Sequence, residues 1–272
     1  MAFIPYNYLN SVVAIGANNR WIGTGFLFGF YYGKDEDNNS LYHLYLVTNK
    51  HIFNNFKSVY IRFNPQSEEA STDYTIELMD EFENKYWTCH LDENIDVAVM
   101  GIDHNILIED KMDFDYFKSD ENALYLSGLK SIGISEGDFI YLLGFPMNLV
   151  QEYRQYVIAR NGCIARIRDV LDFRNNYFLI DCAAFPGNSG GPVILKPETN
   201  CIEGTQAVPE ALIIGMVRSY LTFMDEAISN RTFRTRVVFE ENSGLAEVIP
   251  MDYVYETILE DLNKRKLMES TE

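Results

Sequence analysis

The sequence predicts an all-β protein built as two β-barrels and closed by one C-terminal helix. Short apolar segments with strand-like alternation recur between residues 11 and 102, and a second run follows between residues 138 and 239. An acidic, irregular stretch at residues 103–122 separates the two runs and is typical of a connection. Helical spacing of apolar residues occurs only near the end of the chain. Two runs of strands with one terminal helix indicate an all-β architecture of two barrels.

The first run begins with Ser11–Ala17, followed by Asn18-Asn19, a pair suited to the positive φ of a tight turn. Aromatic residues, which strands favour, then dominate Trp21–Tyr32. Further strands are expected at Leu41–Thr48, Val59–Phe63, Thr75–Met79 and Val97–Ile102. We therefore expect an N-terminal barrel within residues 1–120, which include most of the acidic connection.

The second run predicts a C-terminal barrel over residues 121–250. Its strands are expected at Asp138–Leu143, Gln155–Ala159, Cys163–Ile167, Tyr177–Asp181, Pro192–Leu195, Ala211–Val217 and Phe233–Phe239. The final segment, residues 251–272, is expected to form a helix over Asp252–Lys266, because apolar residues recur there every three or four positions. Asp252 suits the N-cap of this helix, and basic residues at its end suit the helix dipole.

The composition is that of a globular protein with a strongly acidic surface. Of the 272 residues, 47% are hydrophobic and only 17 are Gly and 8 Pro, which excludes disordered, collagen-like and coiled-coil proteins. Lys and Arg number 22 against 40 Asp and Glu, and the resulting charge of −18 repels phosphate backbones. We therefore expect no nucleic-acid ligand. The charge fits either a plain acidic surface or one that binds basic proteins.

The cysteines predict a reducing compartment. Cys89, Cys163, Cys182 and Cys201 form no CxxC pair and no metal-ligand spacing with a histidine, so no metal and no other cofactor is expected. Four scattered cysteines in a chain of this size favour buried free thiols, although the sequence alone also permits two disulfides. Neither a signal-peptide-like start nor an apolar run of about 20 residues is present. The expected location is cytoplasmic, without membrane contact.

The strongest chemical signal is the glycine-rich segment Phe185–Pro192, FPGNSGGP. Three glycines around one serine cost conformational entropy unless the backbone must adopt conformations that other residues resist. A tight turn here would expose the Ser189 hydroxyl and aim the amides of Gly187 and Ser189 at one point, as an oxyanion hole requires. The alternative is a glycine-rich hairpin turn with an incidental serine.

A serine nucleophile needs a base, and His51 is the histidine best placed to supply it. It lies just past the end of an expected strand, between apolar segments. His43 is expected to fill a strand position, and His90 and His104 lie in polar surroundings where we expect them to be solvated. By position alone, His51 fits a structural histidine equally well.

The base needs a buried carboxylate that fixes its tautomer. Asp96 abuts the apolar strand IDVAVMGI, where an acid is costly to bury unless it is paired. Asp92 and Glu93 lie in the polar stretch LDEN and are expected to be solvated. The alternative for Asp96 is an aspartate in a surface turn.

Together, the segments TNKHIF, IDVAV and PGNSGGP, in the order His, Asp, Ser, resemble the trypsin-like (chymotrypsin-fold) serine peptidases. The run DCAAFPGNSGGPV is similar to bacterial stand-alone trypsin-like peptidases related to the Deg, or high-temperature-requirement, group, without a PDZ extension. Supporting motifs are GTGFLF, YLLGFP and IIGMV. The resemblance implies two six-stranded antiparallel barrels with the active site between them.

By this resemblance, His51 is the general base and acid, Asp96 is its orienting partner and Ser189 is the nucleophile. The backbone amides of Gly187 and Ser189 form the oxyanion hole. Asn188 departs from the aspartate that digestive relatives pair with a newly cut N-terminus, so activation by such cleavage is not expected.

The resemblance also implies a substrate pocket. Ala183 lies at its base, with Ala184 and Phe185 in its wall, and the segment Arg218-Ser219-Tyr220 narrows the groove where relatives carry small residues. A methyl group offers no partner to a substrate cation, so we expect cleavage after small or aliphatic residues.

The sequence therefore predicts a serine endopeptidase that works through an acyl-enzyme, with restricted specificity, a protein or peptide substrate and a regulatory partner. Bacterial peptidases of this type occur as effectors in stress and immunity pathways, which is one role that the resemblance implies. Two alternatives stand beside it. A catalytically silent peptide-binding module would not need a complete His, Asp and Ser set. An esterase with the same triad fits the residue types, although the GxSxG elbow of the α/β-hydrolases is absent.

Overall fold

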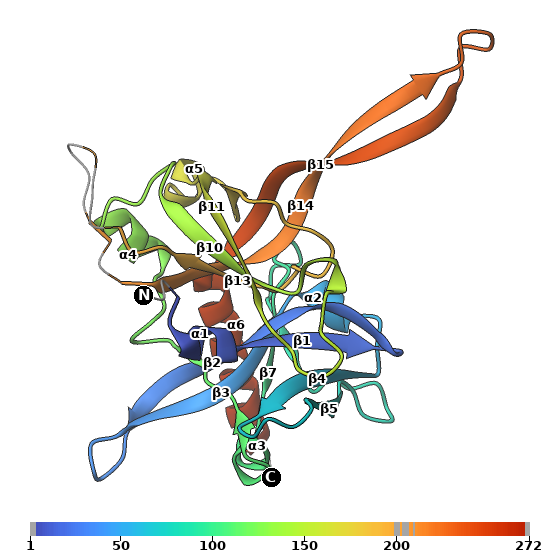
Figure 1. Cartoon of the computed structure of the whole chain (residues 1–272). Coiled ribbons are helices and arrows are strands. Elements are labelled where there is room, and N and C mark those ends of the chain that lie inside the picture. Colours follow the sequence, from blue (N-terminus) through green and yellow to red (C-terminus); the bar gives the residue numbers. More distant parts are fainter. Residues whose placement is uncertain (1–3, 199–201, 203–206, 209, 270–272) are drawn as a thin grey trace.

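The structure is a computed structural model of the whole chain, and it describes residues 4–198, 202, 207, 208 and 210–269. Among these residues, the strands form a nine-stranded sheet in the first half and a closed six-stranded barrel in the second (Figure 1). A long helix, α6 (Met251–Glu269), follows the barrel. This confirms the predicted all-β fold with a C-terminal helix.

The N-terminal sheet follows the strand order β5-β4-β1-β2-β3-β7-β6, so its strands run along an open path rather than a ring. β8 pairs with β4, and β9 runs parallel to β2. Asn18 and Asn19 have φ angles of 50° and 59°, which confirms the tight turn between β1 and β2. The strands are β1 (Val12–Ala17), β2 (Arg20–Lys34), β3 (Ser40–Thr48), β4 (Ser58–Pro65), β5 (Thr72–Glu77), β6 (Thr88–Cys89), β7 (Ala98–Gly101), β8 (Met112–Asp113) and β9 (Phe117–Lys118).

The C-terminal barrel closes in the order β10-β11-β12-β15-β14-β13. Its strands are β10 (Phe139–Gly144), β11 (Ile158–Arg166), β12 (Phe178–Asp181), β13 (Pro192–Leu195), β14 (Leu212–Ile228) and β15 (Thr235–Pro250). The two strands expected between residues 155 and 167 are one strand, β11, because Gln155 lies in a loop and hydrogen-bonds with its side chain to the carbonyl of Arg62. β14 and β15 are much longer than expected, and their outer parts project as a hairpin from the body (Figure 1).

The expectation that only the end of the chain is helical is wrong in detail. Five further α-helices of four to six residues and one 3₁₀ turn occur in the described part of the chain, and a single turn is too short to show a helical period. They are α1 (Tyr6–Asn10), α2 (Lys50–Phe53), α3 (Asn105–Glu109), α4 (Leu126–Ser131), α5 (Arg168–Leu171) and η1 (Pro146–Asn148).

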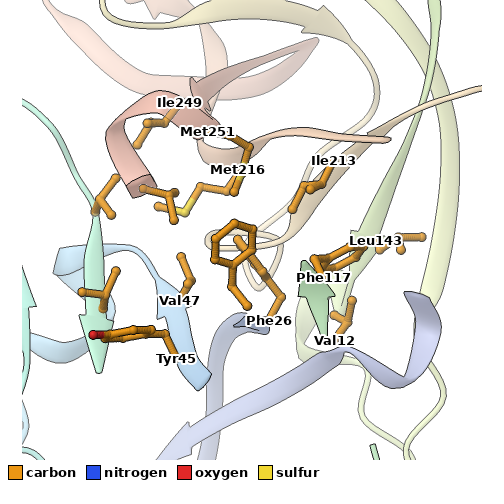
Figure 2. Close-up of a cluster of buried hydrophobic side chains, with 14 of the residues drawn as sticks. Val12, Phe26, Tyr45, Val47, Phe117, Leu143, Ile213, Met216, Ile249 and Met251 are labelled. Carbon is orange, nitrogen blue, oxygen red and sulfur yellow. The ribbon is translucent and has the colours of Figure 1, made fainter. Parts of the chain in front are cut away.

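A shared hydrophobic core joins the two halves. Figure 2 shows Phe26, Tyr45 and Phe117 from the sheet packed with Met216 from the barrel and Met251 from α6. Two further cores lie within the individual halves. Burial of large side chains from both halves in one cluster fixes the loops of the sheet relative to those of the barrel. The predicted boundaries, at residues 120 and 250, lie just after β9 and at the start of α6.

Helix α6 is also tied to the sheet by a buried carboxylate. Asp261 accepts hydrogen bonds from the hydroxyls of Tyr45 at 3.1 Å and Thr88 at 2.9 Å, and it pairs with Arg265 at 2.7 Å. Burial and the adjacent Asp261 raise the pKa of Tyr45. The helix therefore braces β3 and β6 against the barrel.

Cys89, Cys163 and Cys182 are free thiols, and Cys201 lies outside the described residues. In the described part of the chain, no group of three or more His, Cys, Asp or Glu side chains could hold a metal ion. None of the described helices combines the length and the apolar character needed to cross a membrane.

Candidate active site

The structure brings His51 and Asp96 together. β3 and β7 are antiparallel partners with Thr48 opposite Ala98, so the end of β3 lies beside the start of β7. His51 follows β3 in the short helix α2, and its Nδ1 lies 2.6 Å from Asp96 Oδ2. The backbone N–H of His51 donates to Asp96 Oδ1 at 3.0 Å. Two bonds to one carboxylate fix both the backbone and the ring of His51.

In this pair, the imidazole of His51 is exposed to solvent and the carboxylate of Asp96 is shielded from it. The His51 side chain is 49% exposed, whereas that of Asp96 is only 15% exposed. A carboxylate can only accept a hydrogen bond from the ring, so Nδ1 carries the hydrogen in this contact. Among the described residues, nothing hydrogen-bonds to Nε2 of His51. The ring therefore presents an unpaired nitrogen to solvent.

The other acids near Asp96 have different partners. Asp92 accepts hydrogen bonds from the backbone and side chain of Asn94, which hold the pKa of Asp92 below its usual value. The backbone carbonyl of Glu93 accepts a hydrogen bond from Lys50. Asp92 and Glu93 are both exposed, as expected.

In the described part of the chain, no histidine other than His51 hydrogen-bonds to the Asp96 carboxylate. His43 occupies a strand position in β3, as expected, and stacks on Tyr32 with ring centroids 4.1 Å apart. Burial, aided by Arg265, lowers the pKa of His43. The expectation that His90 is solvated is wrong, because its side chain is 12% exposed and its Nε2 lies 3.0 Å from a carboxylate oxygen of Glu256 in α6. His104 is half-buried at the start of α3.

Ser189 lies in the turn between β12 and β13. Two positions of this turn have backbone conformations that favour glycine. Gly187 has φ +97° and Gly190 has φ +82°, both in the left-handed region. A Cβ at Gly187 would collide with the carbonyl oxygen of Phe145, and one at Gly190 would collide with the carbonyl oxygen of Thr24. Close approach of this turn to β2 and to Phe145, directly after β10, therefore explains Gly187 and Gly190.

Thr24 in β2 holds this turn from the other half of the molecule. Its hydroxyl donates to the carbonyl of Gly187 at 2.6 Å and accepts the N–H of Phe145 at 3.1 Å. Its backbone N–H donates to the carbonyl of Ser189 at 3.0 Å. The sequence analysis used the motif GTGFLF but did not identify Thr24 as a residue of the site. A polar threonine within a strand of apolar residues is the feature that could have indicated it.

Gly23 places the Ser189 turn next to α2. A Cβ on Gly23 would lie 2.6 Å from Cδ1 of Ile52 and 3.4 Å from the carbonyl oxygen of Ser189. Ile52 directly follows His51 in the chain. Ser189 and the His51 helix therefore flank the same backbone position of β2.

Two amides of the turn are unpaired. In the described part of the chain, the N–H groups of Gly187 and Ser189 donate no hydrogen bond, whereas the N–H of Asn188 donates to the carbonyl of Phe185 at 2.9 Å. The buried side chain of Asn188 also closes the turn, since its Oδ1 accepts the N–H of Phe185 at 3.0 Å. The turn thus leaves two amides available to bind an oxyanion.

The three residues expected to form the base and wall of the substrate pocket have different environments. Ala183 is exposed, while Ala184 is buried in the barrel core and its carbonyl accepts the Nδ2 of Asn242 at 2.5 Å. Phe185 is half-buried, with the Arg160 guanidinium 5.0 Å from its ring centre.

The segment Arg218-Ser219-Tyr220 is tied to β15. Arg218 pairs with Glu247 at 2.9 Å, and the hydroxyl of Ser219 donates to the same carboxylate at 2.8 Å. Tyr220 packs against the barrel core. Sequence reasoning missed Glu247, which neutralises Arg218, because the two residues are 29 positions apart.

Cys182 is a poor nucleophile in spite of its place before the turn. It is buried, and burial raises the pKa of its thiol to about 11. At neutral pH it therefore remains almost entirely protonated.

Comparison with known proteins identifies the family. Residues 23–202, more than half of the chain, match the trypsin-like peptidase domain. Among solved structures, human heparin binding protein has a TM-score of 0.51 at 11% identity, over 96% of this chain and 95% of that chain. The atomic-resolution structure of HBP has a TM-score of 0.50 at 11% identity, with 96% and 95% covered.

The apo MamO protease domain from Magnetospirillum magneticum has a TM-score of 0.47 at 11% identity, over 92% of this chain and 96% of that chain. A search of curated proteins finds no match. At such identities the structural likeness concerns the fold alone, and the family rests on the domain match. The chain belongs to the trypsin-like peptidase family.

Proposed function

We propose that this protein is a serine endopeptidase in which Ser189 is the nucleophile, His51 the general base and Asp96 its orienting partner. The observation that carries the proposal is the 2.6 Å contact between His51 Nδ1 and the shielded Asp96 carboxylate, with Nε2 left unpaired. The Ser189 turn, across Gly23 from the His51 helix, supports the same assignment.

The chemistry follows from these roles. Nε2 of His51 takes the proton of the Ser189 hydroxyl as Oγ attacks the carbonyl carbon of the scissile bond. Asp96 stabilises the imidazolium, and the amides of Gly187 and Ser189 bind the oxyanion of the tetrahedral intermediate. The imidazolium then gives its proton to the leaving amine, which departs and leaves an acyl-enzyme. Water, deprotonated by the same imidazole, hydrolyses that ester and regenerates Ser189.

The proposed substrate is a peptide or protein cleaved after a small or aliphatic side chain. Ala183 offers no charge to bind a substrate cation, and burying an unpaired cation is costly. Arg218 is neutralised by Glu247, so it has little charge left to attract an acidic substrate side chain. We further propose restricted specificity and a regulatory partner, consistent with an effector in a bacterial stress or immunity pathway and with a cytoplasmic location.

A binding function of another kind has less support. One solved structure of the same fold is named for heparin binding, but the charge of −18 on this chain repels such a polyanion. A catalytically silent peptide-binding module has no need for an unpaired, oriented imidazole. An esterase with the same three residues differs only in its substrate.

The test compares cleavage of casein and of a proteome-derived peptide library with hydrolysis of short-chain esters. Ser189→Ala and His51→Ala should abolish peptide cleavage, while His43→Ala, which removes another exposed histidine, should not. Cleavage of esters without peptides would favour the esterase. Peptide cleavage that survives in Ser189→Ala would refute the proposal, and dominant cleavage after Lys or Arg would refute the placement of Ala183.

A further inference from the structure

The outer parts of β14 and β15 form a two-stranded hairpin, residues 221–242, which we call the arm. Within the barrel, β14 also pairs with β13 and β15 also pairs with β12. In the arm, from Thr222 opposite Asn242 to Ile228 opposite Thr235, the described strands pair only with each other. Figure 1 shows the arm pointing away from the body. An isolated two-stranded hairpin is at best marginally stable in water, so pairing with a further strand would stabilise the arm.

The arm also exposes large apolar side chains, whereas a hairpin surrounded only by water would be expected to carry polar ones. Seven large ones are each half exposed or more: Phe223, Met224, Ile228, Phe233, Val237, Val238 and Phe239. Apolar residues gathered on an element with free strand edges mark a surface for pairing with another chain. The free edge of β15 is regular between Val237 and Asn242, since the nearest register shift on that strand lies at Arg236.

Charge along the arm changes sign between its base and its tip. Asp225, Glu226, Glu240 and Glu241 lie toward the barrel, whereas Arg231, Arg234 and Arg236 lie at or near the tip. A second arm that runs antiparallel to the first places its basic end against the acidic end of the first. The two bodies then lie on opposite sides of the pairing axis.

We propose that two copies of this chain associate by pairing the free β15 edges of their arms about a two-fold axis at Val238. A two-fold axis perpendicular to the sheet keeps each side chain on its own face, so facing residues are symmetric about the axis. Val238 then faces Val238 of the second copy, and Val237 faces Phe239 of the second copy. Arg236, at the register shift next to Val237, then lies beside Glu240 of the second copy, and this contact of opposite charges occurs twice.

Pairing of the two β15 edges in a neighbouring register gives less favourable cross-strand contacts. An axis at Phe239 sets Val237 opposite Glu241 and Val238 opposite Glu240, so apolar groups face carboxylates. An axis at Val237 sets Arg236 opposite Val238. Cross-strand pairs of like character and of opposite charge stabilise a sheet, which favours the register centred on Val238.

The β14 edge is a poorer pairing surface. Between residues 221 and 228 it carries Asp225 and Glu226 and no basic residue, so no register yields an opposite-charge pair. The two free edges of the arm are therefore not equivalent, and β15 is the edge that fits a second copy.

The first test is a charge reversal followed by sedimentation velocity over a range of concentrations. The wild-type protein should form a species of twice the 31.4 kDa chain mass. Because this contact of opposite charges occurs twice, Arg236→Glu or Glu240→Arg alone should weaken the dimer about tenfold. The double variant should restore it, and Glu226→Arg on β14 should leave it near the wild-type affinity. Thermal melting of each variant checks that the body stays folded.

The second test is a crosslink at the axis. Val238→Cys should form a disulfide-linked dimer under mild oxidation, because facing strand residues lie within disulfide range. Glu226→Cys, directly opposite Val238 on β14, should not, and the native cysteines are common to both variants. A wild-type protein that is monomeric at every concentration, or a dimer indifferent to the charge reversals, would overturn the proposal. So would a monomer whose arm instead binds phosphatidylserine vesicles.

Discussion

Replacing Thr24 by valine tests how the two halves cooperate at the candidate site. Valine keeps the shape of the side chain but removes the hydroxyl that bonds the carbonyl of Gly187 and the N–H of Phe145. Both groups belong to buried residues, so neither gains water in exchange. Leaving a buried polar group unpaired costs about 1–3 kcal/mol, so two such groups predict a loss of about 2–6 kcal/mol in the free energy of unfolding.

The same substitution should slow catalysis. Gly187 supplies one of the two proposed oxyanion amides, and removal of one such donor costs about 100- to 1,000-fold in kcat in a related case. Thr24→Val loosens the donor rather than removing it, so we expect kcat to fall about 10- to 100-fold with little change in KM. Denaturant unfolding and steady-state peptide cleavage, at a temperature where the variant is folded, measure the two effects.

Thr257→Val is the matched control. Thr257 is also buried, but its hydroxyl donates to the carbonyl of Tyr253 inside α6, a carbonyl that lies within the helix ladder. We expect a stability loss of about 1 kcal/mol and an unchanged kcat. Equal stability losses in the two variants, with kcat unchanged in Thr24→Val, would refute the role given to Thr24.

The remaining predictions concern Asp96 and residues outside the candidate site. Asp96→Asn should cut kcat by about 10⁴, because an amide favours the wrong tautomer of His51, and near-full activity would mean that another acid orients the ring. Burial raises the pKa of the Cys182 thiol to about 11, so its alkylation at pH 8 should be about 100-fold slower than that of a thiol of pKa 9. Mass spectrometry of the native protein measures this rate, and alkylation at the ordinary rate would show that Cys182 is not buried. Asp261→Asn should destabilise the fold by about 1–3 kcal/mol, because it weakens the hydrogen bonds that the buried carboxylate accepts from Tyr45 and Thr88 of the sheet and removes its ion pair with Arg265 within α6. Peptide cleavage at low temperature should stay close to the wild-type rate.

The parts of the fold that could be predicted are those with a period in the sequence. Alternation located most strands within a few residues, and spacing of three and four located α6. β6, β8 and β9 have two residues each, which is too short for a period. The arm was predicted only in fragments, because both of its faces are exposed to solvent and its sequence therefore loses the alternation of a half-buried strand.

The residues of the candidate site also fall into those that a local motif indicates and those that only the three-dimensional structure identifies. His51, Asp96 and Ser189 could be proposed because each lies in a compact local motif. Thr24 could not, since its hydroxyl acts on Gly187, 163 positions away. His90 was predicted wrongly for the same reason, because the Glu256 that pairs with it is 166 positions away in α6. Local sequence indicates which residues are able to react, and long-range pairing decides which of them meet.

Fluorophosphonate labelling of the purified protein tests the central claim most directly. The reagent reacts with a serine hydroxyl only when a base and an oxyanion site activate it. We predict one label per chain, mapped by mass spectrometry to Ser189, strongly reduced in His51→Ala and absent in Ser189→Ala. An unlabelled wild-type protein, or a label that persists in Ser189→Ala, would contradict the assignment of Ser189 as the nucleophile.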